Sequence, residues 1–286
     1  MTTIGIDKGR VRRHFDRHAH EYDRYAAVQR HMAEELQAGL CERRNGQEVR
    51  RIVEIGCGTG LLTAMLLDAY PYADVTSIDI SPKMAEATRL RCMSEAERRL
   101  TVLTADAESI LLEAEWAQER FADIDLLVSS AAFQWFNDTR QTLNLWLGRM
   151  SAAGLLAFAT FGPDTFNELH SAFRIAEQEL GIEPQSSGQH FMSQEEWEGL
   201  LYSYDKFPWE VDCREELVLQ RFDSVLSFLD SIKRVGAGNA VQDGREGFPS
   251  ARQRMKKMIE AYTQVYGSND GIPATYQLYY TFYGKG

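Results

Sequence analysis

The alternation of apolar runs with helical patterns from residue 51 onward constrains the fold more than any other feature of the chain. Such alternation is typical of a parallel sheet whose strands are joined by right-handed helical crossovers. It predicts strands near 51–55, 74–79, 100–105, 123–129 and 154–160, and helices over 60–70, 82–96 and 137–149. The helix over 82–96 should have Ser81 as its cap and Pro82 as its first residue. We therefore expect an α/β protein with a doubly wound, mostly parallel sheet.

The segment before the first strand, residues 1–45, is predicted to be a helical arm. Spacings of three and four indicate one helical face, formed by Phe15, Ala19, Tyr22, Ala26, Gln29, Ala33, Leu36 and Leu40. The apolar members of this face should pack on the sheet. Tyr22 and Gln29 can also form hydrogen bonds, so we expect them to face a cofactor and the arm to act as a lid.

The pattern becomes less regular after residue 161, which indicates an insertion over 162–208. A helical stretch over 164–180 leads into a turn-rich segment. The insertion is expected to form a roof over a bound substrate. The rest of the chain predicts a strand over 209–221, helices over 222–235 and 250–266, and a strand over 275–283. A length of 286 residues suits one domain, 1–286, that carries these additions.

The composition argues against several classes of protein. Lys and Arg number 31 against 42 Asp and Glu, giving a net charge of −11 that disfavours non-specific nucleic-acid binding. No apolar run reaches the roughly 18 residues of a membrane span, and the first residues show no apolar signal segment, so a cytoplasmic location without membrane contact is expected. The four cysteines contain no CxxC pair, and the pair His14 and His18 lacks a third ligand, so no metal is expected.

The predicted first strand runs directly into a glycine-rich loop that precedes an apolar helix. Its candidate ligand-binding residues are Gly56, Cys57, Gly58 and Gly60. Glycines allow close approach of the backbone to a ligand, and a helix start offers free N–H donors. The dinucleotide pattern G-x-G-x-x-G would need glycine at position 61, where the chain has Leu61. Glu54 would oppose a pyrophosphate but can hold an ammonium group, which favours S-adenosylmethionine.

Two further carboxylates follow the next predicted strands. Asp79 ends the second strand, where its carboxylate can accept both hydroxyls of a ribose. Asp106 ends the third strand and could accept from an adenine amine, with Ile80, Met84 and Ala107 on either side of the ring. Carboxylates at strand ends also serve as helix caps, and for Asp106 that alternative stays open.

These segments together resemble the class I S-adenosylmethionine-dependent methyltransferases. The motifs VEIGCGTG, the Asp79 acid, TADAES and LLVSSAAFQWF occur in the order found in that family. Three further stretches resemble the malonyl-acyl carrier protein O-methyltransferases of biotin synthesis. They are Phe15-x3-Ala19-x2-Tyr22 with Gln29, Phe133-Gln134-Trp135, and residues 231–237, SIKRVGA.

The resemblance implies a Rossmann-like fold of seven strands with the last antiparallel, and S-adenosylmethionine as the cofactor. The implied acceptor is the free carboxylate of a malonyl thioester on acyl carrier protein, or on coenzyme A, in an early step of pimeloyl and biotin synthesis. It adds Ser129 and Ser130 to the cofactor residues, and its substrate candidates are Gln134, Trp135, His170 and Lys233. A carboxyl group is already ionised at pH 7, so no catalytic base is expected. Lys233 could equally form a surface ion pair, and His170 could be structural.

Alternatives remain at this level. A methyltransferase for another small carboxylate or a quinone-type acceptor would share the cofactor motifs, and so would a non-catalytic S-adenosylmethionine-binding protein. A dinucleotide-dependent dehydrogenase is disfavoured by Leu61 and Glu54. The oligomeric state is left open.

A carrier protein, acidic in the context of the family, would have to approach a chain of charge −11. Two basic clusters could receive it: Arg10, Arg12, Arg13 and Arg17 in the arm, and Arg252, Arg254, Lys256 and Lys257 in the predicted helix over 250–266. Both clusters could also be solvated helix faces, so the sequence does not choose between them.

Overall fold

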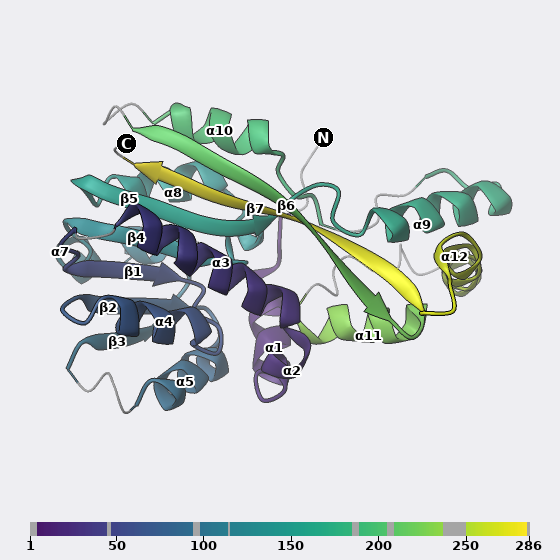
Figure 1. The fold of residues 1–286 in the computed structure, drawn as a ribbon, viewed down its shortest axis with the longest axis horizontal. Helices are drawn as coiled ribbons and strands as arrows, with labels where there is room; N and C mark the ends of the chain where they lie inside the picture. Colours follow the sequence, from purple (N-terminus) through teal and green to yellow (C-terminus); the bar gives the residue numbers. More distant parts are fainter. Residues whose placement is uncertain are drawn as a thin grey trace. The chain divides into compact units, whose positions relative to one another are not determined.

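The computed structural model describes residues 5–44, 47–93, 98–113, 115–184, 189–204, 209–236 and 250–284. Among these residues, seven strands form one sheet in the order β3-β2-β1-β4-β5-β7-β6 (Figure 1). The strands are β1 (Arg51–Ile55), β2 (Asp74–Asp79), β3 (Leu100–Thr104), β4 (Ile124–Ser130), β5 (Met150–Phe161), β6 (Glu210–Phe222) and β7 (Ile272–Gly284). Strands β1 to β5 pair in parallel, whereas the arrow of β7 points opposite to that of β6 in Figure 1. The predicted fold class is confirmed.

The arm and the crossovers between the parallel strands are helical. The helices of this part are α1 (Lys8–His18), α2 (Tyr22–Tyr25), α3 (Ala27–Arg43), α4 (Leu61–Ala69), α5 (Pro82–Arg91), α6 (Ile110–Glu113), α7 (Glu115–Arg120), the short 3₁₀ helix η1 (Phe133–Trp135) and α8 (Thr139–Leu147). Later in the chain follow α9 (Asn167–Leu180), α10 (Gln194–Tyr202), α11 (Val225–Arg234) and α12 (Ser250–Tyr266). Helix α5 begins as predicted, because the Ser81 hydroxyl accepts from the Met84 amide and Pro82 is the first residue.

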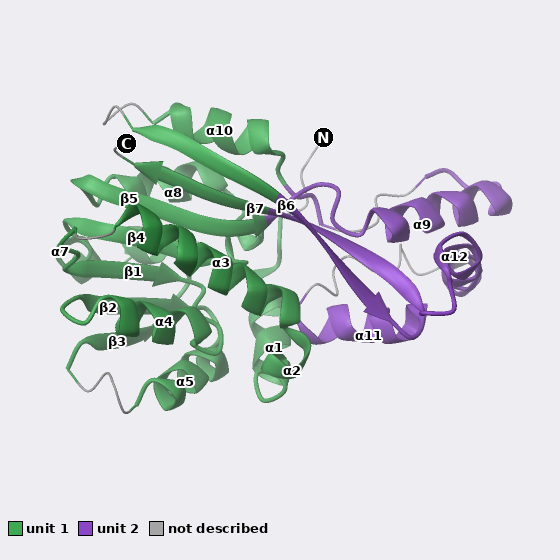
Figure 2. Cartoon of the chain, in the orientation of Figure 1, with its two compact units in different colours: residues 1–160, 192–215, 279–286 green, residues 161–191, 216–278 purple. Residues whose placement is uncertain are grey.

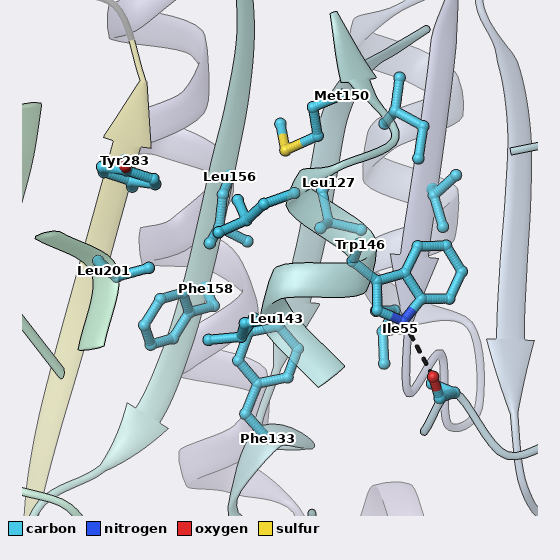
Figure 3. Close-up of a cluster of buried hydrophobic side chains, with 14 of the residues drawn as sticks. Ile55, Leu127, Phe133, Leu143, Trp146, Met150, Leu156, Phe158, Leu201 and Tyr283 are labelled. Atoms are coloured by element: carbon cyan, nitrogen blue, oxygen red, sulfur yellow. Dashed lines mark hydrogen bonds between the residues drawn. The ribbon is translucent and has the colours of Figure 1, made fainter. Parts of the chain in front are cut away.

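Side chains that alternate along the strands bury both faces of the sheet. Figure 3 shows Ile55, Leu127 and Phe158 in a cluster with Leu143 and Trp146 of α8. The Trp146 indole donates to the Ala107 carbonyl at 2.9 Å, so this large buried side chain has its polar atom paired. On β7, Tyr283 belongs to this cluster, whereas the neighbouring Phe282 lies against Gly39 of α3. Helices therefore cover both faces, as a doubly wound sheet requires.

The chain forms two compact units (Figure 2). Unit 1 comprises residues 1–160, 192–215 and 279–286, and unit 2 comprises 161–191 and 216–278. The expected insertion over 162–208 is thus divided between them, with α9 in unit 2 and α10 in unit 1. Its role as a roof stays a prediction.

The arm differs from the expected single helix. It is broken at residues 19–21 and at Ala26, which separates α1, α2 and α3. The first break is a turn in which the Glu21 amide donates to the His18 carbonyl at 3.0 Å, and the Glu21 carboxylate meets the His18 ring at 2.9 Å. Periodicity cannot reveal such breaks, because a helix that resumes after a turn of suitable length keeps its apolar spacing. The sequence analysis also missed α6, α7 and α10.

Candidate active site

The glycine loop between β1 and α4 is held against the end of β2. The amides of Gly56 and Cys57 both donate to the Ile78 carbonyl, at 2.7 and 3.1 Å. Gly58 has φ +55°, and a Cβ built there meets no atom within 4 Å. Its backbone is therefore open to a ligand in the way the sequence predicts.

Asp79 links this loop to the start of α5. One carboxylate oxygen accepts from the Gly58 amide at 2.9 Å, and the other accepts from the Ser81 amide at 2.8 Å. Each oxygen keeps a second lone pair, so both can still accept from the hydroxyls of a ribose. Burial raises the pKa of Asp79 to about 6, even though these two hydrogen bonds act in the opposite direction.

Glu54 is a buried carboxylate beneath the same loop. One of its oxygens accepts from the Thr63 hydroxyl at 2.5 Å and from the Ser77 hydroxyl at 2.7 Å. Burial raises its pKa to about 7, and the two hydroxyl hydrogen bonds only partly oppose this. A ligand cation would restore the charged form, which fits the expected ammonium partner.

Two adjoining cavities open on this loop, and both are lined by Tyr22, Gly56, Gly58 and Ser130. The first adds the strand-end residues expected around an adenosine, together with η1: Asp79, Ile80, Met84, Asp106, Ala107 and Trp135. The second adds Gln29, Glu54, Cys57 and two arginines that the sequence analysis had not singled out, Arg30 and Arg91. Acidic and cationic side chains thus share the second cavity, a combination suited to a ligand that carries both an ammonium and a carboxylate.

The arm supplies one wall of both cavities. Lys8, Val11 and Phe15 of α1 line the first cavity, and the Phe15 ring meets Trp135 edge-on at 5.8 Å between centroids. Tyr22 of α2 lines both, and its pKa is raised by burial and by the neighbouring Asp79, so the phenol stays protonated. The arm thus lies beside the candidate cofactor residues, and its role as a lid stays a prediction.

Polar contacts hold the arm to the ends of the strands. Lys8 contacts Asp106 at 3.3 Å and Glu108 at 2.5 Å. Asp16 accepts from the Ser81 hydroxyl at 2.7 Å, and Asp23 accepts from the Thr59 hydroxyl at 2.6 Å. Asp23 also pairs with Arg91 of α5. No local signal in the sequence indicated these partners, because each pair joins segments that are far apart in the chain.

Two other predicted cofactor residues, Gly60 and Ser129, have packing roles. Gly60 has φ +85°, and its α-carbon faces the Thr88 backbone, so this glycine allows α4 and α5 to approach closely. Ser129 is buried and donates to the Ile55 carbonyl at 2.9 Å. Cys57 lines the second cavity, but burial raises the pKa of its thiol well above the ordinary value, so it is no nucleophile at neutral pH.

The predicted substrate residues are divided between the two units. Trp135 lines the first cavity, and the side-chain NH2 group of the neighbouring Gln134 donates to the Ala131 carbonyl at 2.7 Å. His170 and Lys233 belong to unit 2. His170 is half-buried with a pKa lowered by burial and by Arg174, and Lys233 is an exposed residue at the end of α11. Both stay predictions.

Two observations indicate that a nucleoside cofactor fits these cavities. The Ser130 hydroxyl lines both, is buried, and has no hydrogen-bond partner among the residues that the structure describes. Asp106 accepts from the Glu108 amide at 3.0 Å, as a turn cap does, yet it also faces the first cavity. The two interpretations of Asp106 are therefore compatible. The described residues contain no group of three His, Cys, Asp or Glu side chains placed to bind a metal.

Residues 53–156 match the family model of a methyltransferase domain. The fold is similar to that of YcgJ from Bacillus subtilis, with a TM-score of 0.56 at 13% identity over 88% of this chain and 99% of that one. Malonyl-acyl carrier protein O-methyltransferase from Halalkalibacterium halodurans is 36% identical over 96% of this chain and 97% of its own length. The enzyme of that name from Priestia megaterium is 35% identical over 95% of both chains. The chain belongs to the malonyl-acyl carrier protein O-methyltransferase family.

Proposed function

We propose that the protein transfers a methyl group from S-adenosylmethionine to the free carboxylate of a malonyl thioester on acyl carrier protein, an early step of biotin synthesis. The observation that carries this proposal is similarity over nearly the full length to relatives named for that activity. It extends beyond the cofactor-binding half to the arm and to unit 2. Malonyl-coenzyme A as an alternative acceptor and a cytoplasmic location belong to the same proposal.

The two cavities divide the methyl donor between them. Asp79 would accept from the ribose, Asp106 from the adenine amine, and Ile80, Met84 and Ala107 would enclose the ring. In the second cavity Glu54 would pair with the ammonium group, and Arg30 lies where it could pair with the carboxylate of the same amino acid. When bound, the sulfonium supplies an electrophilic methyl group.

The residues of this site position and enclose the reactants rather than move protons. The acceptor carboxylate is ionised at neutral pH, so it needs no base. Burial raises the pKa values of Tyr22 and Cys57, so both side chains stay neutral at pH 7. Phe15 and Trp135 give the first cavity apolar walls that would limit the entry of water, and in a water-poor site the opposite charges of carboxylate and sulfonium attract more strongly.

The test is a mass-spectrometric assay of methyl transfer. The purified chain should methylate malonyl-acyl carrier protein and produce one S-adenosylhomocysteine for each ester formed. Free malonate, trans-aconitate and a quinone precursor, assayed in parallel, represent the other acceptor classes. Faster transfer to one of these would replace the proposed acceptor. Binding of S-adenosylhomocysteine without any transfer would favour a non-catalytic protein.

The part of the chain that the structure describes includes no helix that is both apolar enough and long enough to cross a membrane.

A further inference from the structure

Helix α1 has two faces of different character. Lys8, Val11 and Phe15 line the first cavity. Arg10, Arg13 and Arg17 recur at spacings of three and four, so they lie on one stripe of the helix, and all three are exposed. At 100° per residue this stripe is centred on the side opposite Val11 and Phe15. The helix that walls the cofactor cavity therefore presents a row of guanidinium groups to solvent.

Among the residues that the structure describes, none forms an ion pair with Arg10, Arg12, Arg13 or Arg17. The acid within the helix, Asp16, is engaged by Ser81 and by the Lys83 amide. Four unpaired cations on one short helix are notable in a chain whose net charge is −11.

The other basic cluster is largely neutralised. Arg254 is buried against Glu177 and packs on the Phe173 ring. Lys257 pairs with Glu179 at 3.0 Å, and Lys256 lies 3.7 Å from Glu260. Three of its four cations are therefore occupied within unit 2, which leaves Arg252, whereas all four arginines of the cluster on α1 lack an ion pair among the described residues.

We propose that the outer stripe of α1, formed by Arg10, Arg13 and Arg17, docks an acidic surface of the carrier protein that bears the malonyl group. This inference rests on the proposed function. A protein of charge −11 repels an acidic partner at long range, so a local cationic patch is needed to orient the approach. Docking on α1 would hold the carrier against the helix that lines the first cavity, which shortens the path of its acyl arm to the cofactor.

The test compares two charge-reversal variants that change the net charge equally. Arg13→Glu/Arg17→Glu alters the stripe, and Arg252→Glu/Lys256→Glu alters the exposed side of α12 with the same i, i+4 spacing. Steady-state kinetics would be measured with malonyl-acyl carrier protein and with malonyl-coenzyme A. We expect the α1 variant to raise KM for the carrier substrate about tenfold and the α12 variant to change it less than twofold. The difference should shrink with added salt, because the Debye length is about 8 Å at physiological ionic strength.

Calorimetry with S-adenosylhomocysteine would verify that both variants keep the cofactor site. An equal rise in KM for the carrier substrate in both variants would show that only net charge matters, and it would contradict docking on the stripe. If the α1 variant raises KM equally for the carrier substrate and for malonyl-coenzyme A, the arginines contact phosphate groups that both substrates carry. That result would also contradict docking of the carrier surface. If the unmodified protein transfers no methyl group to the malonyl carrier, the proposed function fails. Carrier binding measured by surface plasmon resonance then decides docking separately. No binding to the unmodified protein, or unaltered binding to the α1 variant, rejects docking on the stripe.

Discussion

Glu54 and Asp79 are carboxylates whose buried positions make the charged form costly, with pKa values of about 7 and about 6. An acid whose pKa is raised by folding stabilises the fold fully below its unfolded pKa, near 4, and this contribution is lost as the pH rises through the folded pKa. A cationic ligand group next to Glu54 has the opposite preference, because it stabilises the ionised carboxylate. Stability of the free protein and affinity for the cofactor should therefore change in opposite directions with pH.

We expect the melting temperature of the free protein to fall between pH 5 and pH 7.5, while S-adenosylhomocysteine binds about tenfold more tightly at the upper end of this range. Glu54→Gln keeps the shape and can still hydrogen bond to Thr63 and Ser77. This variant should lose most of the pH dependence of both the melting temperature and the affinity for S-adenosylhomocysteine. Thermal melts and calorimetry at several pH values measure them, and a Gln variant that retains the full pH dependence would reject Glu54 as the titrating group.

Asp79→Asn removes one charge and keeps the side-chain volume. Hydrogen bonds to a charged acceptor contribute about 1.5–3 kcal/mol, so affinity for S-adenosylhomocysteine should fall roughly ten- to a hundredfold. The melting temperature of the free protein should also fall, because Asn has one acceptor oxygen and leaves either the Gly58 or the Ser81 N–H without its partner. Asp74→Asn, at the exposed start of the same strand, is the matched control. Unchanged affinity for S-adenosylhomocysteine in the Asp79 variant would show that Asp79 does not bind the ribose.

The arm illustrates how an element can pack closely and still open. Its ties to the strand ends are mostly ion pairs and side-chain hydrogen bonds at the rim of the cavities, such as Lys8 with Glu108 and Asp23 with Thr59. Contacts of this kind contribute little each, so the arm can detach at low cost. By contrast, α3 is anchored by Met32, Leu36 and Leu40, each with no exposed area.

Amide hydrogen exchange tests this difference between the two parts of the arm. Residues 8–25 should exchange quickly in the free protein and become protected when S-adenosylhomocysteine is added, because a ligand in the two cavities would contact Tyr22 and their other walls. Residues 32–43 should be protected in both states. Equal protection of residues 8–25 with and without ligand would identify the arm as permanent packing.

At the scale of the whole molecule, the cofactor cavities and the buried ion pair lie in different units. Every residue that lines the two cavities belongs to unit 1, whereas Arg254 and Glu177 join α12 to α9 inside unit 2. Their side chains are only 6% and 2% exposed. Loss of one partner from such a pair is severe, because the remaining charge has no compensation.

Arg254→Met should therefore destabilise unit 2 by about 3–5 kcal/mol. Amide exchange in α9 and α12 should accelerate, while affinity for S-adenosylhomocysteine stays within twofold of the unmodified protein. Arg252→Met, on the exposed side of the same helix, serves as the control and should leave both measurements unchanged. A large loss of cofactor affinity in Arg254→Met would mean that the units are energetically coupled.

The sequence by itself determined the parallel sheet, the glycine loop with Glu54 and Asp79, and the start of α5. These features depend on local chemistry: apolar periodicity, glycines at positive φ, and a Ser-Pro helix start. The family motifs led to the same cofactor residues, and most of them line the two cavities.

The tertiary structure alone decided the breaks in the arm, its ties to the strand ends, and which basic cluster keeps free charge. Lys8 and Asp106 are 98 residues apart, and Arg254 and Glu177 are 77 apart. Nothing in the local sequence around Arg254 distinguishes it from Arg252, yet one is buried in an ion pair and the other is exposed. The physical reason is that a charge is neutralised by whatever the fold brings within a few ångströms of it, and chain spacing does not encode that distance.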